Sequence, residues 1–269
     1  MSPVRALVLT GFGLNCDYET AHAFTVAGAV PERVHLNSLV DREQSLQDFQ
    51  IFVIGGGFSW GDDHGAGVIM AMRLKHRLKD DILRFVEKGG LVLGICNGFQ
   101  VLVNLGLLPG FEPRTMKREV ALINNDCGGF RDQWVHLAAN GQSPCVFTRG
   151  IDTLELPVRH GEGKFFAEPE VLQRLERQQQ VILRYALPGG TPAQGEFPCN
   201  PNGSVADIAG VCDPTGCIAG LMPHPEAFNH WTNHPDWTSR KETARREGKE
   251  LSEEGHGIRL FRNAVEYFQ

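Results

Sequence analysis

Three short apolar runs, each ending at a glycine-containing turn, constrain the fold of this chain more than any other feature. The runs cover residues 6–10, 51–54 and 91–95, and a polar segment or a helix-like pattern separates each from the next. Continuous apolar runs of four or five residues are typical of strands that are buried on both faces. Such strands alternating with helices predict a parallel sheet with helices on both faces.

The helical and later strand segments complete this prediction. Between residues 65 and 88, Ala71, Leu74, Leu78, Ile82 and Phe85 recur with helical spacing, and two glycines follow. Further helices are expected at about 18–27 and 98–105. From about residue 118 the pattern changes to strand-like runs interrupted by Gly, Pro and Asn, near 119–123, 133–138, 154–159 and 181–186. A last buried strand is predicted at 218–222, a solvated helix within 239–254, and a closing amphipathic helix from Ile258 to Phe268.

We therefore expect an α/β fold, with a mostly parallel, doubly wound, flavodoxin-like sheet, helices on both faces and a small antiparallel extension. The chain has 269 residues, no internal repeat and no linker long enough to divide it. A single domain over residues 1–269 is expected, with a polar C-terminal elaboration at about 229–255.

Composition and charge exclude several classes of function. The formal net charge is −6, so no basic surface for nucleic acid is expected. No apolar run reaches eighteen residues, and the first one is too short for the core of a signal peptide. We expect a cytoplasmic protein with no membrane partner. The seven cysteines contain only one close pair, Cys212 and Cys217, whereas zinc frameworks usually need two, so no metal site is expected.

The sharpest local feature is Gly94-Ile-Cys96-Asn-Gly98, in which an apolar strand runs directly into a tight turn and a helix. This arrangement is like a nucleophile elbow, because small flanking residues allow the turn to raise one side chain above the sheet edge. The N-terminus of the helix favours the thiolate of Cys96, and the amide of Asn97 points the same way and could stabilise an oxyanion. The same turn could equally bury Cys96 as a small apolar side chain, and the pentapeptide alone leaves both interpretations open. The other six cysteines are expected to tolerate replacement.

A thiol nucleophile needs a base, and Met222-Pro-His224-Pro-Glu226 offers one at the end of the last buried strand. In an extended segment residues i and i+2 point to the same side, so Glu226 could orient the ring of His224. Both would face Cys96 across the carboxyl edge of the sheet, which gives a Cys-His-Glu triad. Taken alone, His224 is more simply a structural histidine held between prolines.

The loop Gly55-Gly56-Gly57 follows a buried strand but lacks the Lys-Ser/Thr ending of a phosphate loop. Its glycines would instead allow backbone amides to approach a developing oxyanion.

Together these motifs resemble the class I (triad) glutamine amidotransferases, because Gly56-Gly57, Gly94–Gln100 and Pro223–Glu226 occur in that family's order. A narrower resemblance is to the glutaminase subunits of phosphoribosylformylglycinamidine synthases, which belong to de novo purine biosynthesis. That resemblance is carried by Asn15-Cys16-Asp17, the loop Gly56–Asp62, the segment His160–Gly163 and the segment Asn200–Ser204. It spans about residues 4–228.

The resemblance implies a role for each matched residue. Cys96 would attack the side-chain amide of L-glutamine and form a glutamyl thioester, with His224 as base and acid and Glu226 holding His224. The amides of Gly57 and Asn97 would form the oxyanion hole. The substrate would be bound by Gly56, Phe58, Gln100, His160, Gly161 and Glu162.

The resemblance also implies a partner. Ammonia would pass to a large synthetase subunit, with or without a small bridging subunit, and the complex would act as an ATP-dependent C–N ligase on formylglycinamide ribonucleotide. ATP and Mg would bind that partner, and no cofactor is expected in this chain.

Three alternatives stay open. The ammonia could feed another synthetase, such as one that makes anthranilate, GMP or CTP. A free-standing cysteine hydrolase of the same fold is a second, although its histidine typically follows the cysteine directly, where this chain has Asn97. A subunit that keeps the fold without the reaction is the third, and an intact Cys96, His224 and Glu226 argue against it.

Overall fold

One sheet of nine strands organises the computed structural model, which describes residues 3–250 and 252–269. Residues 1, 2 and 251 of the predicted domain lie outside the described residues. The strand order is β2-β1-β3-β4-β11-β10-β9-β6-β7. The strands of this sheet are β1 (Arg5–Thr10), β2 (Val30–His35), β3 (Ile51–Ile54), β4 (Leu91–Ile95), β6 (Arg131–Ala139), β7 (Thr153–His160), β9 (Val181–Ala186), β10 (Ile208–Cys212) and β11 (Ile218–Leu221).

The first five strands in this order are parallel, and the other four continue the sheet in antiparallel pairing. A separate two-stranded antiparallel sheet pairs β5 (Val120–Ile123) with β8 (Lys164–Ala167). The expected α/β class is therefore confirmed, and the antiparallel extension is part of the main sheet. Neither β8 nor β10 was predicted from the sequence.

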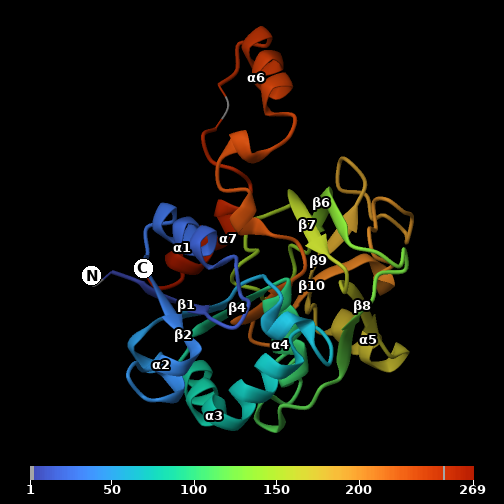
Figure 1. Cartoon of the computed structure of the whole chain (residues 1–269). Coiled ribbons are helices and arrows are strands. Elements are labelled where there is room, and N and C mark those ends of the chain that lie inside the picture. Colours follow the sequence, from blue (N-terminus) through green and yellow to red (C-terminus); the bar gives the residue numbers. More distant parts are fainter. Residues whose placement is uncertain (1–2, 251) are drawn as a thin grey trace.

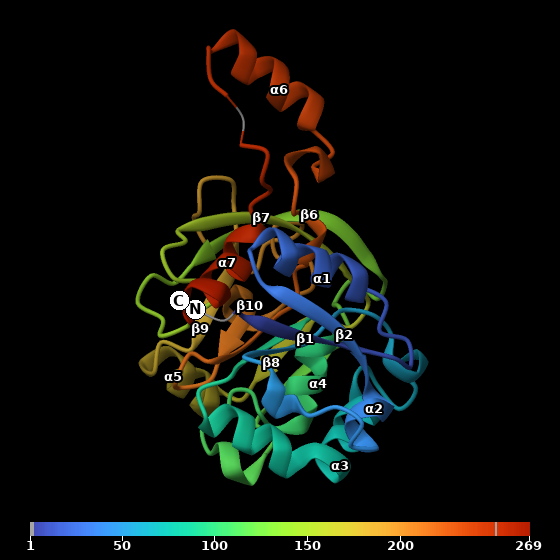
Figure 2. The same cartoon turned by 90° about the vertical axis from the view of Figure 1, so that its left-hand side faces the viewer.

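Helices cover both faces of the parallel part. Figures 1 and 2 show α1 (Asp17–Val26) beside α7 (Ile258–Glu266) on one face, and α3 (Val68–Glu87) and α4 (Asn97–Leu105) on the other. The helix α2 (Leu36–Val40) follows β2, and α5 (Pro169–Arg177), which was not predicted, precedes β9. The predicted helix at 65–88 begins only at Val68, because His64, Gly65 and Gly67 take positive φ angles and form a loop.

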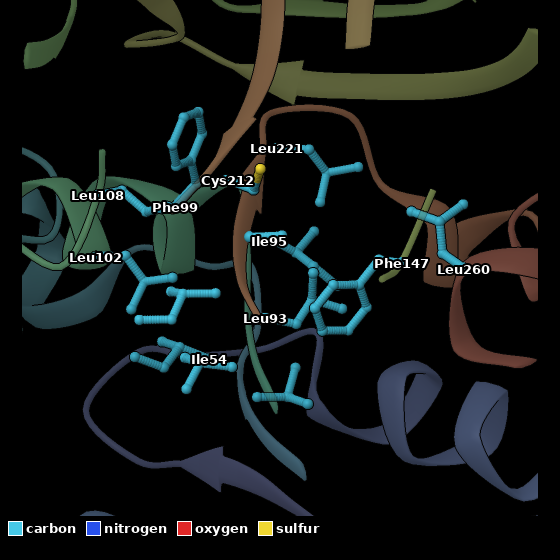
Figure 3. Packing of buried hydrophobic residues seen from close by; sticks show 14 of the residues in the cluster. Ile54, Leu93, Ile95, Phe99, Leu102, Leu108, Phe147, Cys212, Leu221 and Leu260 are labelled. Atoms are coloured by element: carbon cyan, nitrogen blue, oxygen red, sulfur yellow. The ribbon is translucent and has the colours of Figure 1, made fainter. Parts of the chain in front are cut away.

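The core lies between the sheet and these helices. Figure 3 shows side chains of β3, β4 and β11 packed with Phe99 of α4 and with Phe147 from the segment after β6. Each large apolar side chain buried in this way contributes about 1.5–3 kcal/mol. Cys212 lies fully buried in the same cluster, which agrees with the expectation that most of the cysteines are small apolar side chains.

The polar C-terminal stretch forms an arm that projects from the body, carries α6 (Trp237–Arg246) and returns through α7 (Figure 1). The helix predicted within 239–254 thus ends at Arg246. At the base of the arm, His234 is buried and lies 3.0 Å from Glu155 Oε1, and Arg240 donates to Glu155 Oε2 at 2.7 Å. The base is therefore fixed to β7.

No helix among the described residues combines the length and the apolar character needed to cross a membrane.

Candidate active site

The turn at Cys96 has the strained geometry that the sequence predicts. Cys96 lies between β4 and α4 with φ 50° and ψ −106°, and its amide donates to the Leu221 carbonyl at 2.8 Å. A Cβ on Gly98 would lie 1.8 Å from the Ile54 carbonyl oxygen, and one on Gly94 would lie 2.7 Å from Gly98. Both glycines are therefore required, and the strain of about 1–3 kcal/mol at Cys96 is held by the packed sheet around it.

Strand pairing brings His224 to this turn. β11 pairs in parallel with β4, with Leu221 opposite Ile95, and the chain then runs through Pro223 to His224. The amide of His224 donates to the Pro157 carbonyl at 2.8 Å, which fixes the backbone against β7.

Glu226 holds the ring of His224 as expected, with 2.6 Å between Nδ1 and Glu226 Oε1. The expected reason, an extended segment, is wrong, because Glu226 lies in a 3₁₀ turn from Pro225 to Ala227. The ring is 2% exposed and the carboxylate is fully buried. An ion pair this deeply buried is not screened by water.

The environment of His224 favours its charged form. Burial lowers the pKa of His224, but the Glu226 carboxylate and then the thiols of Cys96 and Cys16 raise it, and the net shift is strongly upward. Within the described residues, Nε2 of the ring is buried with no hydrogen-bond partner. The Cys96 thiol lies 3.6 Å from the Arg159 carbonyl. Nε2 is therefore available for proton transfer, and its exchange with Cys96 stays a prediction.

Two backbone amides at the site are also available. Gly57 lies opposite Leu14 in an isolated bridge, but the hydrogen bonds of this bridge are made by the residues on either side of Gly57. Asn97 is the first residue of α4, where a backbone amide has no acceptor within the helix. In the described part of the chain, neither amide donates to a backbone carbonyl outside its own element. These are the two amides predicted for the oxyanion hole, and that role stays a prediction.

The side chain of Asn97 ties the loop after β3 to α4. Its Oδ1 accepts from the Ser59 amide at 3.3 Å, and its Nδ2 donates to Asp62 Oδ1 and to Gln100 Oε1, each at 3.0 Å. Burial and then the nearby Glu162 carboxylate raise the pKa of Asp62 to about 6. This network sets where the glycine loop lies relative to Cys96.

The predicted substrate-binding residues differ in burial and in the hydrogen bonds that they already make. Gln100 is buried, and Nε2 donates to the Glu162 carbonyl at 2.5 Å, so both ends of its amide already have protein partners. His160 is buried with Nδ1 on Asn125, and burial and then the charge of His224 lower the pKa of His160 to about 4. Nε2 of His160 has no partner among the described residues.

The remaining predicted contacts lie at the rim or under the loop. Phe58 is 47% exposed, and the carboxylate of Glu162 accepts from the Ala66 amide at 3.2 Å. The Gly161 carbonyl accepts from the Asn125 amide, and the Gly56 backbone lies against the His224 ring. Their roles in binding glutamine stay predictions.

Sequence reasoning missed Asp62 and, more importantly, Cys16, which precedes α1. Single donor atoms of Cys16, His224 and Glu226 lie within 4.8 Å of one another. The donor types suit zinc, but 2.6 Å between the His224 and Glu226 atoms is shorter than the ~3.3 Å between two ligands of tetrahedral zinc. His224 and Glu226 are therefore joined by a hydrogen bond, while the Cys16 thiol donates to Asn15 Oδ1 at 3.5 Å. The only sequence signal was the Asn15-Cys16-Asp17 motif, which indicated a resemblance but no position.

Comparison with known proteins identifies the family. The model of the CobB/CobQ-like glutamine amidotransferase domain matches residues 3–268. Proteins named phosphoribosylformylglycinamidine synthase subunit PurQ match along nearly the whole chain. One from Methanococcus maripaludis strain S2 is 43% identical over 98% of this chain and 97% of its own length, and one from Dehalococcoides mccartyi is 45% identical over 99% of this chain and 98% of its own length.

Solved structures agree with this assignment. The structure of PurLQS from Thermotoga maritima matches with a TM-score of 0.72 and 28% identity, covering all of both chains. The glutaminase domain of Trypanosoma brucei CTPS matches with a TM-score of 0.51 and 13% identity over 93% of this chain and 96% of that one, which shows the shared fold alone. Because the model of this domain matches residues 3–268, this chain belongs to the family of CobB/CobQ-like glutamine amidotransferase domains.

Proposed function

We propose that this chain is the glutaminase subunit of a phosphoribosylformylglycinamidine synthase. The observation that carries the proposal is the match of 43–45% identity, over the full length, to subunits of that name. A free-standing hydrolase or a subunit of another amidotransferase has no comparable relative among these matches, since the CTPS match shows the fold alone.

The geometry of the site supports the first half-reaction. The thiol of Cys96 gives its proton to His224 Nε2, and the thiolate attacks the side-chain carbonyl carbon of glutamine. The amides of Gly57 and Asn97 stabilise the oxyanion. The imidazolium, held by Glu226, then returns its proton to the amide nitrogen, so that ammonia leaves and a glutamyl thioester remains.

The second half-reaction restores the thiol. His224 takes a proton from water, the resulting hydroxide attacks the thioester, and glutamate leaves as Cys96 is protonated again. Asn97 has a second function here, because its side chain fixes the loop that carries Gly57 while its amide serves the oxyanion.

The ammonia is used by a partner. The Thermotoga maritima relative is described as part of PurLQS, so we propose a complex with a large synthetase subunit and a small bridging subunit. ATP and Mg are then needed on the synthetase. Within this chain we propose one amidotransferase domain, because a single sheet takes strands from residue 5 to residue 221, with 229–255 as a peripheral elaboration.

The test uses the assembled complex. Cys96→Ala should abolish glutamine-dependent synthesis of formylglycinamidine ribonucleotide and leave ammonia-dependent synthesis unchanged. Cys212→Ala is the matched control, because Cys212 is a buried cysteine of the apolar core. Continued use of glutamine by the Cys96 variant would overturn the assignment of the nucleophile.

Labelling tests nucleophile and substrate together. Mass spectrometry after incubation with diazo-oxo-norleucine should find a single adduct on the Cys96 peptide, and excess glutamine should block it. An adduct on another cysteine, or one that glutamine does not block, would contradict the proposal.

A further inference from the structure

A second cysteine, Cys16, lies against the ring of His224, and the proposed mechanism gives it no role. Cys16 is 6% exposed and occupies the position just before α1. Its Sγ lies within 4.8 Å of a ring nitrogen of His224 and of a carboxylate oxygen of Glu226. Neither the attack nor the proton transfers of the proposed mechanism uses this thiol.

The backbone holds Cys16 rigidly in place. Its amide donates to the Gly56 carbonyl at 3.3 Å, and its own carbonyl accepts from Thr20 Oγ1 at 2.6 Å. A Cβ on Gly56 would lie 2.7 Å from His224 Cε1 and 3.1 Å from Cys16 Sγ. Ring, thiol and glycine backbone therefore meet in one closely packed contact.

The charges around this contact keep the thiol neutral. The thiol donates to Asn15 Oδ1 at 3.5 Å, which leaves the sulfur lone pairs to face the ring of His224. Burial raises the pKa of Cys16, the polar contact with His224 lowers it, the charge of Glu226 raises it, and the net shift is upward. Glu19 of α1 acts in the same direction as Glu226. The titratable groups that face the His224 ring are thus Glu226 from the turn after β11, Cys96 from the turn after β4, Cys16 and His160 from β7.

We propose that Cys16 is a positioning residue of the glutaminase site, whose neutral thiol holds the imidazole of His224 with Nδ1 on Glu226 and Nε2 turned toward Cys96. The proposal rests on the proposed function for its catalytic meaning. Its physical content is independent of the substrate, because it concerns how readily Cys96 passes its proton to His224.

Removing the thiol should weaken the imidazolium–thiolate pair. In Cys16→Ala the ring loses a polar contact that favours its charged form and gains space beside Gly56. We expect the pH profile for alkylation of Cys96 by iodoacetamide to move up by about one unit, so that the rate at a given pH on the rising part of the profile falls about tenfold. The kcat for glutamine should fall with it, whereas KM should change less than threefold.

Two further variants separate positioning from a loss of stability. Cys16→Ser keeps a neutral oxygen that can accept from the charged ring in place of the sulfur, and it should recover at least half of the shift in the alkylation profile. Cys145→Ala removes a buried cysteine in the segment between β6 and β7 and should leave the profile unchanged. Peptide mapping follows the Cys96 peptide specifically, and thermal melting of each full-length variant reports its stability.

Three results would overturn the proposal. The first is a Cys16→Ala profile that superimposes on that of the parent chain, with or without a lower melting temperature. The second is a Cys16→Ser variant that behaves like Cys16→Ala, since the polar contact would then not hold the ring. The third is an equal shift in Cys145→Ala. Failure of the glutamine assignment would instead appear in the Cys96→Ala complex, with the alkylation profiles unaffected.

Discussion

Replacing Glu226 with Gln should lower the glutaminase kcat roughly a thousandfold. The carboxylate is fully buried, with Oε1 2.6 Å from His224 Nδ1, which places the two charge centres about 4 Å apart. At an effective dielectric constant of about 20 their attraction is worth about 4 kcal/mol. This attraction stabilises the ring only while the ring is charged, which is when Cys96 is a thiolate. In Glu226→Gln the thiolate stage of the reaction loses this stabilisation. A loss of about 4 kcal/mol corresponds to a fall in rate of about 10³.

Gln adds a second defect, because its amide can donate to Nδ1. The ring then carries its proton on Nε2 and cannot accept one from Cys96, as in other triads whose carboxylate is replaced by an amide.

The assay is glutamate release by the assembled complex at saturating glutamine, with ammonia-dependent synthesis as the internal control. A kcat within tenfold of the parent value would refute this reasoning and make Glu226 a structural residue.

Three further predictions concern the turn at Cys96, the loop after β3 and the C-terminal arm. Gly98→Ala should cost at least about 3 kcal/mol of unfolding free energy in urea, because its Cβ would lie 1.8 Å from a backbone oxygen of β3, whereas Gly161→Ala, where the space is open, should be tolerated. If the two variants were equally stable, the tight turn would not be required. The pKa of Asp62 is raised from 3.8 to about 6, so its ionised form is disfavoured in the folded chain. The resulting penalty is small below about pH 4, grows between about pH 4 and pH 6 and is constant above that, so Asp62→Asn should raise the melting temperature at pH 8 and much less at pH 4. A constant difference across this range would contradict the raised pKa. Glu155→Gln removes the charged anchor at the base of the arm and should speed proteolysis within 229–257 without changing glutaminase activity, and cleavage at the parent rate would argue that other contacts hold the arm.

Much of the fold could be predicted from local patterns because the decisive strands are buried on both faces. Ile51–Ile54 and Leu91–Ile95 were predicted with the bounds that the structure has, since continuous apolar runs that end at glycine-containing turns leave little choice. β8 and β10 were missed. The four residues of β8 alternate between buried and intermediate or exposed, and β10 is preceded by residues 206 and 207 with positive φ, which a propensity argument does not expect.

The residues of the site also divide into those that local patterns predict and those that they do not. Cys96 and His224 could be paired from the sequence because each ends a strand, and parallel neighbouring strands end at the same edge. Cys16 could not, because its position depends on α1, the glycine loop and the turn after β11 meeting at Gly56, and no spacing along the chain encodes a meeting of three segments. A residue that reaches a site only because three separate segments pack together has no sequence motif that marks it. Its influence on His224 must therefore be measured at the ring, through the proton that Cys96 and His224 share, rather than deduced from the thiol's own reactivity.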